Sequence, residues 1–243
     1  MKDKKLRVYY DFQIMCLQKY GGISRYHYDL LRSIQEQELA DPDIECVLSQ
    51  NKYFEEYFGK KSRADSRPVK LVVYLINRIR AARSLRKGYD IIHPTYYDPY
   101  ALRCKKSKIV VTVHDMIHEI FPESFAWYDV ETKYKKKYIY RADHIIAISE
   151  STKKDILKFY PDIPEDKISV IYHGSSFQYR EDVRAEVSLP EKYVLFVGRR
   201  DSYKNFVNFF DAMKSILAET PGLHVVCIGG GGFNEQEKEQ IGQ

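Results

Sequence analysis

Short apolar runs alternate along this chain with longer amphipathic segments, beginning within the first ten residues. A continuous apolar run of about five residues is typical of a strand buried on both faces of a sheet. Strands that alternate with helical segments indicate βαβ units, so the pattern predicts an α/β fold with parallel sheets. The strands expected first are 6–10, 44–48, 90–93, 109–113, 144–148 and 168–172. The helices expected between them are 23–37, 69–86, 129–141 and 151–159.

A second sheet-and-helix region follows a polar stretch. There we expect strand 193–197, helix 206–218, strand 223–228 and an unfinished helix at 234–243. The predicted domains are an N-terminal Rossmann-like domain at 1–174, a linker at 175–191, and the incomplete beginning of a second Rossmann-like domain at 192–243. Two strands with one or two helices bury too little apolar surface to be stable alone. The second domain is therefore expected to pack against the first domain, a second copy of the chain or a partner chain, and homo-oligomers through it are one expected outcome.

The segment YVLFVGRRDSYKN, residues 193–205, carries the most informative motif of the chain. Its apolar strand stops at Gly198, and Arg199 and Lys204 follow before the next amphipathic helix. Open α/β sheets bind ligands at the carboxyl ends of their strands, and a helix amino terminus with added cations suits a diphosphate. The motif therefore predicts a diphosphate site.

Composition favours a soluble cytoplasmic protein. The chain has 243 residues, 44% of them hydrophobic, and no apolar run approaches the roughly 20 residues that span a bilayer. Its start lacks the apolar region of a signal peptide. The four cysteines form no CxxC pair, so reduced, packing cysteines are expected, with neither a zinc site nor a disulfide framework.

The net charge of +5 is local, because residues 66–89 contain seven basic side chains and no acid. One interpretation is a solvated helix face. The other is that residues 67–87 lie on an anionic membrane surface, since 69–76 is almost continuously apolar beside those cations. That would place the protein at the inner face of the membrane. No nucleic-acid recognition motif accompanies the basic segment, so nucleic acid is not an expected partner.

Further candidate residues also lie where predicted strands end or helices begin. Gly21 and Gly22, in YGGISRY at 20–26, open the first long helix, where a backbone can approach a ligand or simply make a tight turn. The pair is not GxGxxG, which weakens a nicotinamide-dinucleotide interpretation. His114 follows strand 109–113, and with His118 it makes an HDxxH pattern, but no third metal ligand is evident. A ligand-facing or a packed histidine remains open there.

Three more positions have both a structural and a functional interpretation. Tyr96 and Tyr97 follow strand 90–93 and either face an acceptor or pack as ordinary aromatic residues. His173 ends the last strand of the first domain and either faces the cleft or packs. Asp41-Pro42-Asp43 imitates a DxD metal motif, but its proline marks a turn, so a loop is expected there.

Taken together, the motifs resemble glycosyltransferase family 4, whose members are retaining enzymes of the GT-B fold, and in particular its bacterial polysaccharide mannosyl- and rhamnosyltransferase-like members. The resemblance covers essentially the whole chain. It rests on four stretches in order: YGGISRY at 20–26, VVTVHDM at 110–116, ADHIIAISESTKKDI at 142–156, and VIYHGSS at 170–176 followed by YVLFVGRRDSYKN. The family implies two Rossmann-like domains facing a cleft and sugar transfer from a nucleotide-diphosphate sugar to a glycan or lipid-linked acceptor, without a metal or another cofactor.

By position, the resemblance implies roles for residues at three places in the chain. Arg199 and Lys204 look like the pair that neutralises the donor diphosphate, and Gly22, with Gly21 beside it, like the glycine that approaches the donor from the opposite domain. His114 resembles the active-site histidine near the transferred sugar. Two departures bear on donor identity: Tyr203 stands where arginine is common before the lysine, and His173 where asparagine is common before the glycine.

Other functions are alternatives. A GT-B sugar-nucleotide epimerase would use the same cleft without an acceptor, and a sugar-nucleotide-binding fragment would not catalyse. A nicotinamide oxidoreductase is the least favoured. Because the second domain is incomplete on this reading, the 243 residues alone are expected to lack transferase activity.

Overall fold

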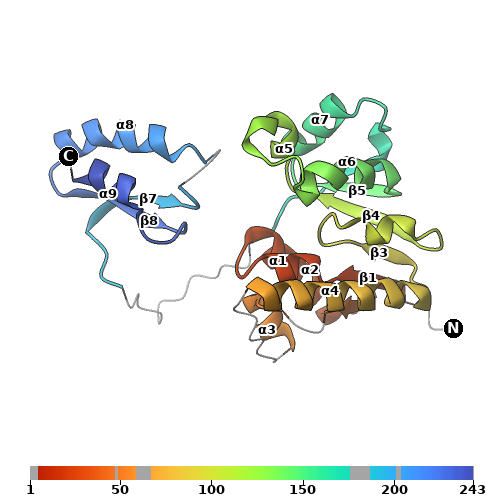
Figure 1. Cartoon of the computed structure of the whole chain (residues 1–243). Coiled ribbons are helices and arrows are strands. Elements are labelled where there is room, and N and C mark those ends of the chain that lie inside the picture. The colour runs from red at the N-terminus through yellow and green to blue at the C-terminus, as the bar shows by residue number, and fades with distance from the viewer. Residues whose placement is uncertain (1–4, 47–48, 59–66, 176–186, 201–203, 243) are drawn as a thin grey trace. The chain divides into compact units, whose positions relative to one another are not determined.

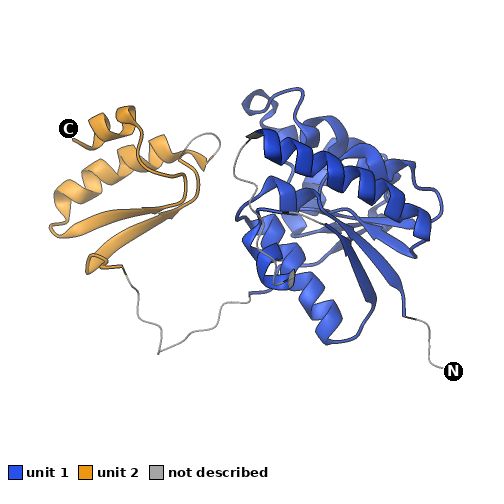
Figure 2. Cartoon of the chain, turned by 60° about the horizontal axis from the view of Figure 1, so that its bottom comes forward, with its two compact units in different colours: residues 1–176 blue, residues 177–243 orange. Residues whose placement is uncertain are grey.

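The computed structural model describes residues 5–46, 49–58, 67–175, 187–200 and 204–242. The chain divides into two compact units, Met1–Ser176 and Phe177–Gln243 (Figure 2). The linker predicted at 175–191 lies mostly outside the described residues, because 176–186 are not among them. Each unit is therefore described by itself.

The first unit is built on a six-stranded, entirely parallel sheet in the order β2-β1-β3-β4-β5-β6 (Figure 1). The strands are β1 (Arg7–Asp11), β2 (Asp41–Glu45), β3 (Ile91–His93), β4 (Lys108–Val113), β5 (His144–Ala147) and β6 (Ile168–Val170). The predicted parallel α/β architecture is confirmed. The order reverses at β1, between β2 and β3, so the carboxyl ends of β1 and β3 flank a topological switch point, where sheets of this kind bind ligands.

Seven α-helices of this unit fall within the described residues. They are α1 (Gln13–Leu17), α2 (Gly22–Glu36), α3 (Lys52–Phe58), α4 (Arg67–Ser84), α5 (Ile117–Ile120), α6 (Val130–Arg141) and α7 (Glu150–Phe159). Single 3-10 turns lie at Leu85–Lys87, Pro99–Arg103, Pro122–Ser124 and Glu165–Lys167. Asp129 caps α6 and Ser149 caps α7, each accepting a hydrogen bond from a backbone amide of the first helical turn.

The core of the first unit joins strand side chains to α6 and α7. Ile92, Ile109 and Ile145 of the sheet are fully buried, and Tyr138 of α6 and Ile156 of α7 pack into the same cluster. These residues come from the apolar runs and the helical periodicity of the sequence. The rigid core fixes the carboxyl edge of the sheet, where the loops that follow the strands meet.

Two predictions for the first unit need correction. Strand β2 lies at Asp41–Glu45, three residues earlier than the start predicted at 44, and residues 47 and 48 of the predicted strand lie outside the described residues. Asp41-Pro42-Asp43 therefore belongs to a strand and not to a loop. Proline is tolerated because β2 is an edge strand paired with β1 alone, and its outer side needs no amide donor. Helices α1 and α3 were not predicted, because five and seven residues are too short for a helical period to show.

The second unit contains the parallel pair β7 (Lys192–Val197) and β8 (Leu223–Ile228), with α8 (Phe206–Glu219) and α9 (Glu235–Ile241). Phe196 of β7 packs against Phe206 and Phe209 of α8, with ring centroids 4.9 and 5.1 Å apart. The helix thus covers one face of the pair, while Val197 on β7 is 64% exposed. In the described part of the chain, no helix has both the length and the apolar character needed to span a membrane.

Candidate functional site

Four histidines gather at the carboxyl edge of the first sheet. His27 lies on α2, His93 ends β3, His114 follows β4, and His173 follows β6. The ring centroids of His27 lie 5.4 Å from those of His93 and 6.3 Å from those of His114, and His114 lies 5.6 Å from His173. The structure therefore brings together two of the predicted site residues, His114 and His173, with two histidines that the sequence analysis did not single out.

Tyr26 of α2 holds this histidine cluster together. Its ring stacks on His173 at a centroid distance of 4.8 Å and meets His114 edge-on at 5.2 Å. Its hydroxyl lies 3.1 Å from Oγ1 of Thr112, which in turn lies 2.9 Å from Nε2 of His93. One threonine hydroxyl thus links the tyrosine of the helix to the histidine of the neighbouring strand and fixes both rings.

The histidine cluster is uncharged at neutral pH. Burial, reinforced by neighbouring histidines, lowers the pKa of His93 and of His114 to about 4, and it lowers the pKa of His27 well below its ordinary value. Nδ1 of His27 and Nε2 of His114 are buried without a hydrogen-bond partner in the described structure. A neutral imidazole with an open nitrogen can donate to or accept from a ligand hydroxyl, so the cluster suits a polar, uncharged group such as a sugar.

The two glycines of the YGG motif open α2 at the same edge. Gly22 is the first residue of α2, and a Cβ there would meet nothing within 4 Å, so the backbone is open to a ligand. A Cβ at Gly21 would lie 2.1 Å from Oε1 of Gln18, which accepts a hydrogen bond from the amide of Ser24. Tyr26 is one turn beyond Gly22, so the helix start and the histidine cluster belong to one surface.

The second unit carries the cationic pair at the end of β7. Arg199 and Lys204 are both exposed, and residues 201–203 between them, including Tyr203, lie outside the described residues. Gly198 has φ +134°, and its amide donates to the carbonyl of Ile228 at 2.8 Å. The side-chain carbons of Lys204 lie 3.8 and 3.9 Å from the place a Cβ at Gly198 would take, so the lysine passes over the strand end.

Arg200 is a buried residue that the sequence analysis missed. Its guanidinium donates to Glu237 at 2.8 Å and to the carbonyls of Gly229, Gly231 and Gly232 at 3.0, 3.2 and 2.8 Å. Gly229, Gly230 and Gly231 have φ between +73 and +92°, a conformation that glycine adopts without strain and that lets the loop wrap the cation. Of the two adjacent arginines, Arg200 therefore braces the loop after β8, whereas Arg199 is exposed.

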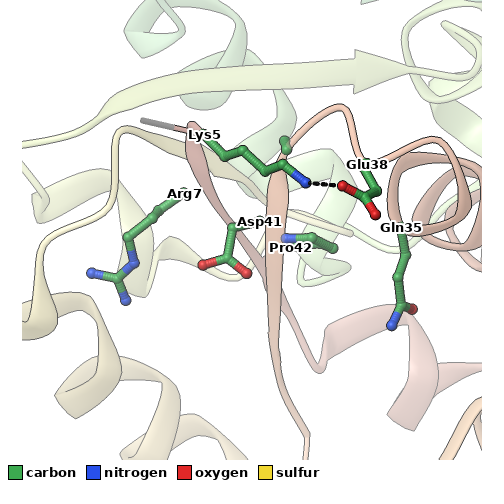
Figure 3. A pocket seen from close by; sticks show the side chains of 7 residues that line it. Lys5, Arg7, Gln35, Glu38, Asp41 and Pro42 are labelled. Atoms are coloured by element: carbon green, nitrogen blue, oxygen red, sulfur yellow. Dashed lines mark hydrogen bonds and ion pairs between the residues drawn. The ribbon is translucent and has the colours of Figure 1, made fainter. Parts of the chain in front are cut away.

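Tyr96 and Tyr97 do not present open faces. Tyr97 is 5% exposed and packs in the core, and Tyr96 is partly buried with its hydroxyl donating to Glu131 at 2.7 Å. Their predicted role toward an acceptor stays a prediction, and this packing does not favour it. A surface hollow at the opposite, amino-terminal edge of the sheet holds none of the predicted site residues (Figure 3). It is lined by Lys5, Arg7, Gln35, Glu38, Ala40, Asp41 and Pro42.

The HDxxH segment does bring three potential metal ligands together. Ligand atoms of Asp115, His118 and Glu131 lie within 4.8 Å of one another. However, Nζ of Lys135 already lies among these groups, 2.8 Å from Glu131, 2.9 Å from Glu119 and 3.1 Å from the carbonyl of Asp115. The buried ammonium supplies the positive charge that a metal ion would bring.

Comparison with known proteins identifies the family. The profile of Glycosyltransferase Family 4 matches residues 20–177, more than half of the chain. The chain belongs to Glycosyltransferase Family 4. The predicted resemblance is thereby confirmed. The chain is also 27% identical over 221 residues to O-antigen chain mannosyltransferase RfbU of Salmonella typhimurium, covering 85% of this chain and 58% of that protein.

Solved structures agree on the fold. The lipopolysaccharide outer core galactosyltransferase WaaB matches with a TM-score of 0.56 at 17% identity, over 97% of this chain and 63% of that one. The UDP co-structure of S. aureus MnaA matches with a TM-score of 0.61 at 13% identity, over 97% and 64%. A UDP-GlcNAc 2-epimerase from Methanocaldococcus jannaschii matches with a TM-score of 0.50 at 15% identity, over 98% and 68%. The predicted GT-B fold is confirmed.

Proposed function

We propose that this chain is part of a retaining glycosyltransferase that acts in the synthesis of bacterial surface polysaccharide. The carboxyl edge of the first sheet, with its histidine cluster, holds the reacting sugar, and we call it the reaction edge. The end of strand β7 binds the diphosphate. The donor is a nucleotide-diphosphate sugar, and the acceptor is a glycan or a lipid-linked sugar. The observation that carries the proposal is the neutral histidine cluster beside the open start of α2, at a sheet edge of a Family 4 chain. The likeness to a mannosyltransferase of O-antigen chains supports it.

Two groups of residues act on two parts of the donor, the diphosphate and the sugar. A departing nucleoside diphosphate gains negative charge, which Arg199 and Lys204 stabilise by preorganised charge–charge contacts, so no metal ion is required. The backbone at Gly22 and the first turn of α2 approach the donor from the first unit. His114 bonds a hydroxyl of the transferred sugar through its open Nε2 and orients the sugar without charging it.

The test is sugar-nucleotide binding and transfer. We expect calorimetry to detect binding of GDP-mannose or a UDP-sugar, and His114→Ala to lower turnover more than donor affinity, because its partner is the reacting sugar. Transfer is assayed with the chain extended to the length of its relatives, since this chain spans 58% of RfbU. Absence of binding to every sugar nucleotide, in the extended protein as well, would contradict the proposal.

The alternative enzyme is a sugar-nucleotide epimerase, because an epimerase is among the structures of similar fold. An epimerase changes the donor sugar without any acceptor, whereas a transferase releases nucleoside diphosphate only as sugar moves to an acceptor. Incubating a labelled donor with and without a lipid-linked glycan separates the two. The third alternative, a binding fragment, predicts donor binding with neither reaction.

We also propose that α4 contacts an anionic membrane surface. Leu71, Val72 and Ile79 on its outer side are 61, 55 and 53% exposed, and Arg83 and Arg86 follow at its end. Each cation near an anionic surface contributes about 1 kcal/mol, and salt weakens the contribution. We expect sedimentation with anionic but not neutral vesicles, and weaker binding for Arg83→Ala with Arg86→Ala. Equal binding to both vesicle types would leave α4 a solvated helix.

We further propose that the second unit self-associates through its open sheet face. Leu195 and Val197 of β7 and Ile228 of β8 are 46, 64 and 54% exposed on strands whose other face packs against α8. A second copy would remove these side chains from water. Sedimentation velocity should show a concentration-dependent dimer that Val197→Asp abolishes. A monomer at all concentrations would exclude self-association.

A further inference from the structure

The chain has a single tryptophan, and it lies on the surface. Trp127 is 80% exposed and the adjacent Tyr128 is 71% exposed. Ile120 and Phe121 of the same loop are 41 and 43% exposed. We call residues 120–128 the aromatic loop. Exposed large aromatic side chains that cluster in this way are typical of interaction surfaces, because water disfavours them.

The aromatic loop rises from the reaction edge of the sheet. It belongs to the crossover from β4 to α6, and His114 is the residue that directly follows β4. Trp127 and Tyr128 meet at a centroid distance of 5.8 Å and an angle of 83°, so their two faces form a corner. One ring therefore meets the other edge-on, and an exposed aromatic face of this pair can pack against one side of a ring-shaped ligand.

Contacts on both sides of Trp127 and Tyr128 along the chain anchor the loop. Phe125 stacks on His118 at a centroid distance of 3.7 Å, and Asp129 accepts a hydrogen bond from the amide of Glu131 at 2.8 Å as it caps α6. Lys135 ties Glu119 to Glu131, and Tyr160 donates to Glu119 at 3.0 Å. Because these contacts hold the chain before and after Trp127 and Tyr128, less backbone entropy is lost when a ligand binds there.

The charges of the loop itself favour a sugar over a lipid surface, and the lysines that follow it begin at Lys133 of α6. From Ile117 to Asp129 the sequence contains three acids, Glu119, Glu123 and Asp129, and no lysine or arginine. Carboxylates repel anionic headgroups but accept hydrogen bonds from hydroxyl groups. The C–H faces of a pyranose ring are weakly positive and pack on the negative faces of aromatic rings.

We propose that Trp127 and Tyr128 form an acceptor platform that stacks a neutral sugar ring of the glycan being extended. The inference rests on the proposed function, since it assigns the acceptor's place in that reaction. Because Trp127 is the chain's only tryptophan, its fluorescence reports the platform directly. The readout needs no donor and no turnover.

The experiment follows Trp127 emission in the 243-residue chain during titration with trisaccharides of mannose, galactose or rhamnose. We expect a saturable blue shift with at least one of them, weakened about tenfold or more by Tyr128→Ala. Trp127→Ala should abolish the calorimetric heat of the same saccharide, whereas Trp127→Phe should retain part of it. Tyr140→Ala is the matched control, an aromatic residue of α6 that is 41% exposed, and it should change nothing.

Three outcomes would overturn the platform: no response to any saccharide, a response that Tyr128→Ala leaves unchanged, or a shift with anionic vesicles alone. The vesicle result would make the loop a lipid contact. Circular dichroism of each variant checks that the fold is retained. The proposed function is tested separately, by sugar-nucleotide binding. If the proposed function is wrong, that binding is absent; if only the platform is wrong, that binding is retained.

Discussion

The two units differ in the charge of the side chains that follow their strands. In the first, the carboxyl edge of the sheet carries histidines whose pKa values fall with burial, so these rings are neutral. In the second, the end of β7 carries exposed Arg199 and Lys204. Parallel strands create a ligand-binding edge in both cases. The side chains that follow the strands decide which ligand each edge suits.

The difference matches the two halves of a sugar nucleotide. A diphosphate carries charge that grows as it leaves, so it needs permanent cations. A sugar carries hydroxyl groups, which need hydrogen-bond partners whose charge does not compete with the reaction. On the proposed function, Arg199 and Lys204 meet the leaving group and the histidine cluster meets the reacting ring. Four measurements test whether the two units differ in this way.

The largest effect is expected from Arg199→Ala combined with Lys204→Ala. Each charged hydrogen bond lost to a diphosphate removes about 1.5–3 kcal/mol, so the double variant should lose about 3–6 kcal/mol of donor binding. Calorimetry with a sugar nucleotide measures the loss. Lys214→Ala, on an exposed lysine of α8 paired with Asp211, is the control and should bind normally. Unchanged donor affinity in the double variant would remove the diphosphate role from the second unit.

Replacing Arg200 should lower the stability of the second unit without a direct effect on contacts to the donor. Arg200→Ala leaves Glu237 and three loop carbonyls without their buried cation, and breaking a buried ion pair typically destabilises by about 3–5 kcal/mol. Hydrogen exchange should accelerate in α9 and β7 while the first unit stays protected. Lys238→Ala removes only an exposed pair with Glu235 and should have little effect. Normal protection of α9 in Arg200→Ala would contradict the bracing role.

Sequence reasoning found the positions of both edges but not their supporting contacts. His114 and Arg199 stand at the ends of recognisable apolar strands, and the order of motifs identified the family. His27 and Arg200 could not be assigned because their roles depend on contacts across long stretches of chain, with His93 and Glu237. Trp127 lies in a loop, where hydrophobic residues follow neither the helical nor the strand period. Its exposure in the folded chain is therefore what identifies it as a candidate binding residue.

The histidine cluster predicts a pH effect on stability. An ordinary histidine has a pKa of about 6.5, and in the folded chain the pKa of His93 is lowered to about 4. The unfolded chain therefore binds a proton first, so stability present above pH 6.5 is lost as pH falls toward 4. Between pH 7 and pH 5, His93 should remove about 2 kcal/mol. Urea unfolding measures this, and His93→Gln should flatten the slope. Identical slopes would show that the ring titrates normally.

The smallest expected effect is that of removing metal ions, which should be none. Glu131, one of the three possible metal ligands, is paired with Lys135, which is fully buried and also pairs with Glu119. Burial alone would lower the pKa of this lysine, but Glu131 and Glu119 outweigh it and raise the pKa, so the ammonium keeps its charge. Donor binding and transfer should therefore be the same with EDTA, magnesium or manganese.

The variant Lys135→Gln tests, within the first unit, whether the lysine takes the place of a metal ion. Lys135→Gln removes the ammonium and leaves Asp115, His118 and Glu131 with ligand atoms within 4.8 Å of one another, so manganese should raise the melting temperature of the variant. The unmodified chain should show no shift, because its own cation holds the carboxylates. Loss of transfer with EDTA and its recovery with manganese would instead show that a metal, and not Arg199 and Lys204 alone, neutralises the leaving diphosphate.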